Sequence, residues 1–267
     1  MDYQSFISQT LSAAAQIANQ NFGRVSSIST KTGDNNQVLT ETDIAVGKMI
    51  VEKIQETYPD YNVIDEEAGV IDKKSQYTWV VDPIDGTSNF ANGLPTYGIM
   101  MGLLDGGQSI AGGIVLPAFN QLYVAQKGQG AFCNGEKIQV TTETKLLSCL
   151  VAYGIDGHQE NPETTYQEAK VLAKIILNIR NLRTTNSAFD MAQVLTGRFG
   201  ALLNQTTKIW DNIALQAIIE EAGGVMTDFW GKPMDYSNAL ERVSENFTMC
   251  AASPELHTQL QEIIHSE

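Results

Sequence analysis

The chain has 267 residues, 43% of them hydrophobic and 18% charged, which is typical of a globular protein and enough for two fused halves. A net charge of −14 argues against binding to nucleic acid and to anionic membranes. No apolar run has the length of a membrane span, the N-terminus does not resemble a signal peptide, and the three cysteines lack CxxC spacing, so we predict a cytoplasmic protein with reduced thiols.

The N-terminal part of the chain predicts two helices separated by a loop. Residues 2–21 have apolar side chains at helical spacing, which predicts an amphipathic helix packed on a sheet. Residues 25–37 are rich in Ser, Thr, Asn and Gly and predict a loop. The periodic run at residues 44–54 predicts a second helix with Thr42 or Asp43 as its N-cap. By spacing alone, Asp43 is therefore a structural cap.

Two acidic residues follow the next predicted strand. Residues 61–65 form a short apolar strand, and Glu66 and Glu67 come directly after it. Adjacent glutamates usually mark a solvated corner of a protein. Because these two leave a buried strand, one of them can instead point toward a buried centre.

A further strand at residues 79–81 leads into the most informative part of the chain. Pro83 is predicted to stop this strand, with Asp82 and Asp85 on either side of the stop. Residues 86–88 then offer backbone amides and hydroxyls that suit an anion. Carboxylates and anion-binding amides are compatible when cations lie between them, and Mg²⁺ combines protein carboxylates with water and phosphate oxygens. A surface turn is the second interpretation, but it requires neither both acids nor the apolar strand.

The remainder of the chain alternates strands and helices. A largely antiparallel, mixed sheet is predicted from strands near 97–104, 109–116 and 121–127 and a hairpin turn at Asn134-Gly135. The later elements are, in order, a strand at 147–153, a helix from Asn161 to Asn178, a short helix from Asn186 to Gly197, a strand at 199–203 ended by Asn204, a helix opening at Trp210-Asp211, strands at 225–228 and 247–251, and a helix capped by Ser253. Asp211 at that helix start would stabilise it by about 0.3–1 kcal/mol with no further role.

Several other kinds of site are excluded by missing motifs. The chain has no Walker A sequence, no G-x-S-x-G elbow and no arginine at the offset required by cysteine-dependent phosphatases. Its three histidines are too scattered for a histidine-built metal site. What remains is an all-oxygen set that favours Mg²⁺, with Mn²⁺ as a substitute: Glu66, Asp82, Asp85 and Asp211.

Three acidic segments resemble, in order, the signatures of the inositol monophosphatase family of Mg²⁺-dependent phosphatases: Ile64–Glu67, Asp82–Phe90 and Trp210–Ala214. Two further segments are also typical of the family, Ala111–Val115 and Gly128–Gly135. The resemblance runs from the first predicted helix to the last. It implies a layered αβαβα sandwich of the sugar-phosphatase type, combining α/β and α+β character. We expect an N-terminal half at residues 1–142, a C-terminal half at 143–267, and the active site between them.

The same resemblance implies roles for individual residues. One Mg²⁺ would be bound by Glu66, Asp82 and the carbonyl of Ile84, a second by Asp82, Asp85 and Asp211, and in some relatives a third, weaker ion is present. Glu67 would support the ligands from outside. Glu66, Thr87 and Asp43 form the predicted catalytic group, in which Thr87, backed by Asp43, orients the attacking water. The predicted substrate-binding residues are Asp85, Gly86, Thr87, Ser187, Ala188, Asn204 and Asp211.

The implied reaction is hydrolysis of a phosphomonoester by metal-activated water, with myo-inositol monophosphate as the first choice of substrate. Histidinol phosphate, fructose 1,6-bisphosphate and other phosphorylated metabolites remain alternatives, as does a catalytically silent, metal-bound scaffold. The resemblance also implies inhibition by Li⁺ and a homodimer. Relatives often have glycine where this chain has Asp65 and Asn186, and many have glutamate in place of Asn204. Lys31 matches a family lysine in a loop near the metals.

Overall fold

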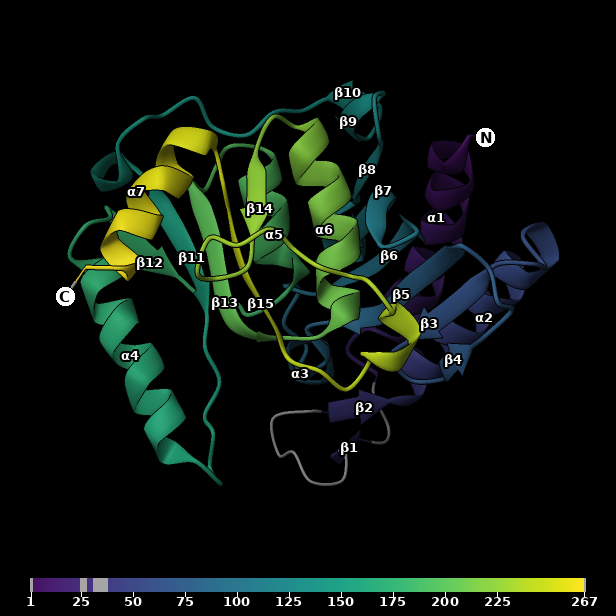
Figure 1. Cartoon of the computed structure of the whole chain (residues 1–267). Helices are drawn as coiled ribbons and strands as arrows, with labels where there is room; N and C mark the ends of the chain where they lie inside the picture. The colour runs from purple at the N-terminus through teal and green to yellow at the C-terminus, as the bar shows by residue number, and fades with distance from the viewer. Residues whose placement is uncertain (1, 25–27, 31–37, 267) are drawn as a thin grey trace.

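The computed structural model describes residues 2–24, 28–30 and 38–266, which form five layers (Figure 1). Helices α1 (Tyr3–Asn21) and α2 (Glu41–Thr57) cover one face of an eight-stranded sheet. Helices α5 (Ala188–Leu195) and α6 (Ile209–Glu221) lie between this sheet and a five-stranded one. The outer layer consists of α4 (Pro162–Ile176) and α7 (Pro254–Ile264). The predicted αβαβα sandwich is confirmed.

The eight-stranded sheet is mixed and largely antiparallel, as predicted. Its strands are, in spatial order, β10 (Glu136–Lys137), β9 (Gly130–Cys133), β8 (Gln121–Gln126), β7 (Gln108–Leu116), β6 (Gly98–Asp105), β5 (Tyr77–Asp85), β3 (Asn62–Asp65) and β4 (Gly69–Ile71). β3 and β5 are parallel, and the other neighbours are antiparallel. Because parallel strands end at the same edge, the residues after β3 meet those at the end of β5.

The five-stranded sheet follows the order β12 (Asn181–Arg183), β11 (Leu150–Gly154), β13 (Ala201–Thr207), β15 (Phe247–Ala252) and β14 (Val225–Thr227). β11 runs parallel to β12 and β13, whereas β15 is antiparallel to β13 and β14. A short helix, α3 (Thr87–Ala91), follows β5. The predicted division near residue 142 falls between the two sheets and stays a prediction about folding units.

Helix α6 lies unusually close to the eight-stranded sheet. Gly102 and Gly112 face each other across β6 and β7. A Cβ atom on Gly112 would lie 2.6 Å from the carbonyl oxygen of Ala214, and one on Gly102 would lie 2.7 Å from Cγ2 of Ile213. These two glycines leave room for the backbone of α6, which has buried residues on most of its circumference because sheets cover both sides.

Four local predictions are wrong. Pro83 does not stop its strand, because β5 continues to Asp85 through a register shift between Asp82 and Asp85, and a bulge tolerates a residue without a ladder N–H. The N-cap of α2 is Thr40, and Asp43 is the third helical residue of a capping box. The strand with Asn204 does not end there but continues past a bulge to Thr207.

The fourth correction concerns the predicted loop at 25–37, in which the described residues Ile28–Thr30 form β1, which pairs with β2 (Val38–Thr40). Ser253 is the N-cap residue of α7, as predicted, although its side chain makes no capping hydrogen bond. Lys31 lies outside the described residues. Among those described, no helix is long and apolar enough to cross a membrane. The three cysteines are free thiols, two of them buried.

Candidate active site

Three strand and helix ends bring the predicted acidic residues together. Asp82 and Asp85 lie at the end of β5, and Asp211 lies in the first turn of α6. One carboxylate oxygen from each of these three residues lies within 4.8 Å of the others. Glu66 follows β3, donates its backbone N–H to the carbonyl oxygen of Val81 at 3.2 Å and lines the same cavity.

The electrostatics of this cluster favour a bound cation. Asp82 is only 2% exposed, and burial, followed by the charges of Glu66, Asp85 and Asp211, raises its pKa well above the ordinary range. Burial and Asp211 likewise raise the pKa of Asp85, although a hydrogen bond from the Ala188 N–H acts in the opposite direction. Oδ1 of Asp82 is buried and has no hydrogen-bond partner in the described part of the chain.

A hard divalent cation resolves both features at once. It removes the repulsion between the carboxylates, and it supplies a partner for the buried Asp82 oxygen. The donors are all oxygens, which suit Mg²⁺ or Mn²⁺ better than a softer transition metal. The residues present therefore fit the predicted metal.

Thr87 and Asp43 form a connected pair beside the carboxylates. The Thr87 hydroxyl lies 3.1 Å from Oδ1 of Asp43 and 2.8 Å from the carbonyl oxygen of Ile84. Its single proton can be donated to one of these acceptors at a time, and its lone pairs remain able to accept from a water molecule. Asp43 is 1% exposed, and burial raises its pKa while hydrogen bonds from Thr40 and Thr87 lower it.

The turn between β5 and α3 packs against the loop that precedes α5. Gly86 has a left-handed backbone with φ of 88°, and a Cβ atom there would lie 2.7 Å from Cβ of Ser187. Oδ2 of Asp190 accepts hydrogen bonds from the backbone N–H groups of Thr185 at 2.7 Å and Asn186 at 3.0 Å. This fixes the loop in which the backbone N–H of Ala188, two residues after Asn186, donates to Asp85.

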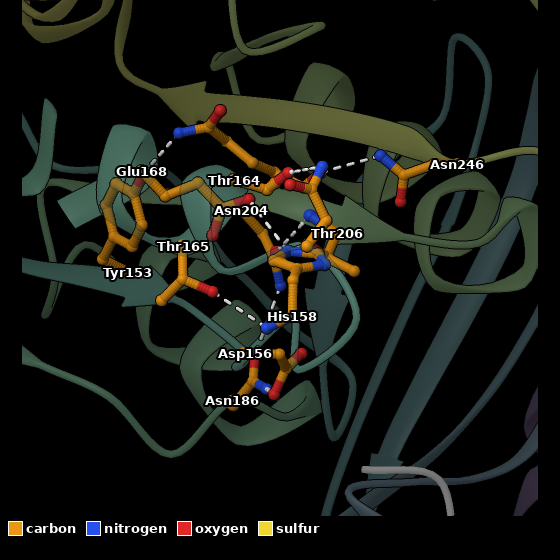
Figure 2. Close-up of polar contacts among 12 residues, drawn as sticks. Tyr153, Asp156, His158, Thr164, Thr165, Glu168, Asn186, Asn204, Thr206 and Asn246 are labelled. Atoms are coloured by element: carbon orange, nitrogen blue, oxygen red, sulfur yellow. Dashed lines mark hydrogen bonds and ion pairs between the residues drawn. The ribbon is translucent and has the colours of Figure 1, made fainter. Parts of the chain in front are cut away.

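Asn204 belongs to a chain of hydrogen bonds in the wall of the same cavity (Figure 2). Its Oδ1 accepts from the Thr206 N–H at 2.8 Å, and its Nδ2 donates to Oδ1 of Asn186 at 3.2 Å. Nδ2 of Asn186 in turn donates to Oδ1 of Asp156 at 3.1 Å. Asn186 has φ of 51°, a left-handed conformation that asparagine tolerates. Asn204 and Asn186 therefore form one polar unit that spans two loops and a strand.

His158 lies on the same wall and was not predicted. Its Nε2 is 3.4 Å from both Oε1 of Glu168 and Oγ1 of Thr206, and its backbone N–H donates to Thr165 at 2.8 Å (Figure 2). Glu168 is only 5% exposed, and burial raises its pKa while His158 lowers it. In the sequence, a lone histidine and a glutamate on an amphipathic helix have no distinguishing spacing.

Most of these groups line one cavity of about 540 Å³. Nine predicted site residues line it: Glu66, Asp82, Ile84, Asp85, Gly86, Thr87, Ser187, Asn204 and Asp211. The other two, Asp43 and Ala188, are not in the wall but are hydrogen-bonded to residues that are. Among the lining residues that sequence reasoning missed, the longest continuous stretch is the segment 156–161, which precedes α4.

Comparison with known proteins finds similarity along nearly the whole chain. The family model described as "Inositol monophosphatase family" matches residues 2–266. A fructose-1,6-bisphosphatase/inositol-1-monophosphatase of Thermotoga maritima is 33% identical over 87% of this chain and 87% of that protein. A putative Nus factor SuhB of Neisseria meningitidis is 30% identical over 94% of this chain and 93% of that protein. The crystal structure of the suppressor protein SuhB of Bartonella henselae superimposes with a TM-score of 0.88 at 25% identity, covering 100% of this chain and 99% of that one.

Proposed function

The chain belongs to the inositol monophosphatase family, and from this we propose that it hydrolyses a phosphomonoester with Mg²⁺, its substrate being myo-inositol monophosphate. The observation that supports this proposal is the cluster of buried Asp82 with Asp85 and the partly buried Asp211, in which one carboxylate oxygen from each residue lies within 4.8 Å of the others. Burial and mutual repulsion raise the pKa of Asp82 and of Asp85, so this cluster is suited to a cation.

In the proposed site, four carboxylates and one backbone carbonyl would hold two or three Mg²⁺ ions, for which Mn²⁺ could substitute: Glu66, Asp82, Ile84, Asp85 and Asp211. When bound, the ions would neutralise phosphate oxygens and the leaving oxygen and would lower the pKa of a water molecule. The Thr87 hydroxyl, held by Asp43, orients this water for in-line attack on phosphorus. The backbone amides of Gly86 and Thr87 bind phosphate oxygens. The water oxygen forms a bond to phosphorus and gives up a proton as the ester bond to the leaving oxygen breaks. The leaving oxygen takes up a proton, so the products are an alcohol and phosphate, and no phosphoenzyme forms.

The leaving group would occupy the part of the cavity between the metal cluster and the wall formed by Asn204, Asn186 and His158. Ser187 borders this space just before α5, and the next residue, Ala188, donates its backbone N–H to Asp85. The wall presents amide, hydroxyl and imidazole groups, which suit a leaving group rich in hydroxyls. A cyclic polyol such as inositol has this chemistry.

A second substrate, fructose 1,6-bisphosphate, is favoured by the names of two curated relatives that are 31% and 33% identical to this chain. The experiment that decides is a panel of phosphorylated metabolites scored for phosphate release with and without Mg²⁺. We expect release from inositol monophosphate that requires Mg²⁺. If kcat/KM is higher for fructose 1,6-bisphosphate or histidinol phosphate than for inositol monophosphate, that compound replaces inositol monophosphate as the proposed substrate. Release from none of the panel would favour a non-enzymatic role, in keeping with the relatives named Nus factor SuhB.

We expect Asn204→Glu to raise kcat/KM for inositol monophosphate while leaving glycerol 2-phosphate nearly unchanged. A glutamate offers two acceptor oxygens to neighbouring ring hydroxyls, whereas the donor group of Asn204 is already bonded to Asn186. One charged hydrogen bond is worth about 1.5–3 kcal/mol, so the gain should be roughly tenfold or more. Steady-state kinetics on the two substrates measure the difference.

Asn246 provides a matched control for this substitution. It lies near the same wall, where its Nδ2 donates to the carbonyl oxygen of Gln205 at 2.8 Å, but it is outside the cavity lining (Figure 2). Asn246→Glu should leave kcat/KM unchanged for both inositol monophosphate and glycerol 2-phosphate. Equal effects of Asn204→Glu on both substrates, or no effect on either, would mean that Asn204 does not select the leaving group.

We also expect inhibition by millimolar Li⁺. The centre is acidic and made of oxygen ligands, so a small hard monovalent cation can occupy a weak Mg²⁺ position and slow product release. A dose series in Li⁺ should lower turnover, whereas KCl at the same ionic strength should not. Full turnover at high millimolar Li⁺ would contradict this expectation.

A further inference from the structure

Asp65 shapes the turn that presents Glu66. The residue ends β3 and is only 2% exposed. Its Oδ1 accepts hydrogen bonds from the backbone N–H groups of Glu67 at 3.0 Å and Ala68 at 2.6 Å. Asp65 also pairs with Gly69 across the hairpin, and Gly69 adopts a left-handed conformation with φ of 83° that suits a three-residue hairpin loop. The carboxylate therefore holds the C-terminal side of this loop.

Helix α2 makes room for that carboxylate at Gly47. A Cβ atom on Gly47 would lie 2.8 Å from Oδ2 of Asp65 and 3.0 Å from Cγ of Pro83. Glycine is unfavourable inside a helix, so its presence in the middle of α2 calls for a packing reason. Asp43 lies four residues earlier, on the same face of α2. One face of this helix thus supports both Thr87, through Asp43, and the turn of Glu66, through Asp65.

We propose that Asp65 is a positioning residue that holds Glu66 toward the metal centre, and that Gly47 provides the space this requires. The inference rests on the proposed function, because it takes Glu66 as a Mg²⁺ ligand. The backbone of Glu66 is fixed on its N-terminal side by pairing of Asp65 with Val81 and by its own N–H bond to Val81. On its C-terminal side it is fixed by the amides bound to Asp65. Removing the Asp65 carboxylate releases this second side and lets Glu66 turn away from Asp82.

Mn²⁺ binding to the purified protein, measured by the EPR signal of free Mn²⁺ in the absence of substrate, tests this inference without an activity assay. We expect Asp65→Ala to weaken Mn²⁺ binding roughly tenfold, the usual size of an effect from a residue that orients a metal ligand. Asp65→Asn retains an acceptor oxygen for the two amides and should stay within about threefold of the wild-type affinity. The control is Asp72→Ala, because Asp72 accepts the N–H of Lys74 at 2.8 Å in a similar turn outside the cavity lining.

Gly47→Ala supplies an independent test with every polar group retained. The added Cβ should displace the Asp65 carboxylate and weaken Mn²⁺ binding severalfold. In the Asp65→Ala background the contact with the carboxylate is gone and only the contact with Cγ of Pro83 remains. Gly47→Ala should therefore weaken Mn²⁺ binding less there than in the wild type, and a double-mutant cycle measures the part of its effect that acts through Asp65. Circular dichroism and thermal unfolding check that each variant is folded, and Gly47→Ala carries the test alone if Asp65→Ala does not fold.

The outcomes separate this inference from the proposed function. Wild-type Mn²⁺ affinity in folded Asp65→Ala or Gly47→Ala would overturn the inference, even if thermal stability falls, because the role would then be purely structural. Additive effects in the double-mutant cycle would overturn the part assigned to Gly47. Absence of Mn²⁺ binding by the wild-type protein would overturn the proposed function and the inference with it.

Discussion

Asp82→Asn is expected to remove nearly all activity without unfolding the protein. The substitution keeps the size of the side chain but takes a shared negative charge out of the metal centre, which should cost at least about 3 kcal/mol of transition-state stabilisation, or two orders of magnitude in kcat/KM. Asp85→Asn should have a similar effect. Phosphate release at saturating Mg²⁺ measures the loss.

Although these variants should lose activity, their thermal stability in the absence of metal should not fall. Burial and neighbouring carboxylates raise the pKa of Asp82, so its charge is unfavourable in the folded state without a cation. The midpoint of thermal unfolding in EDTA should therefore be unchanged or higher for Asp82→Asn. Glu52→Gln, at an exposed acid on α2 that pairs with Lys48, is the control and should alter neither property. Near-normal turnover of the wild-type enzyme in EDTA would contradict the metal-dependent reaction.

Thr87→Val is expected to lower kcat by about two to three orders of magnitude with little change in KM. It retains the shape of threonine but removes the hydroxyl that lies between Asp43 and the carbonyl oxygen of Ile84. A group that acts on the attacking water contributes in the transition state more than in substrate binding, and such contributions are typically about 10²–10⁴-fold.

Asp43 should act through the same hydroxyl. Asp43→Asn is therefore expected to have a smaller effect than Thr87→Val, and the double variant should be no worse than Thr87→Val alone. Thr258→Val on α7 is the matched control, because the Thr258 hydroxyl also donates to a backbone carbonyl, that of Pro254 at 3.0 Å, outside the cavity lining. A proportional loss for Thr87→Val in kcat and in 1/KM, or independent effects of the two substitutions, would show that Thr87 does not orient the water.

The local spacing of residues in the sequence was sufficient to predict most helices and strands and to locate the acidic motifs. The helical spacing of residues 2–21 and the apolar strand before Asp82 predict their own structure, because the periods of helix and strand are properties of the chain itself. The carboxylates at the end of that strand are likewise visible as a motif. Local pattern failed at Pro83 and at Asn204, where a bulge changes the pairing between strands and each strand continues.

The sequence by itself determined which residues are acidic, which strands they follow and which family motifs they match. Only the tertiary structure decided which distant groups meet, because that depends on how layers pack. Gly102 and Gly112 are ordinary strand residues until α6 lies against them at the Ala214 carbonyl. His158 meets Glu168, and Asn204 meets Asn186, across loops that no spacing relates. Asp65 likewise has no apparent role in the sequence, but in the fold its carboxylate fits the space left by Gly47 on another element.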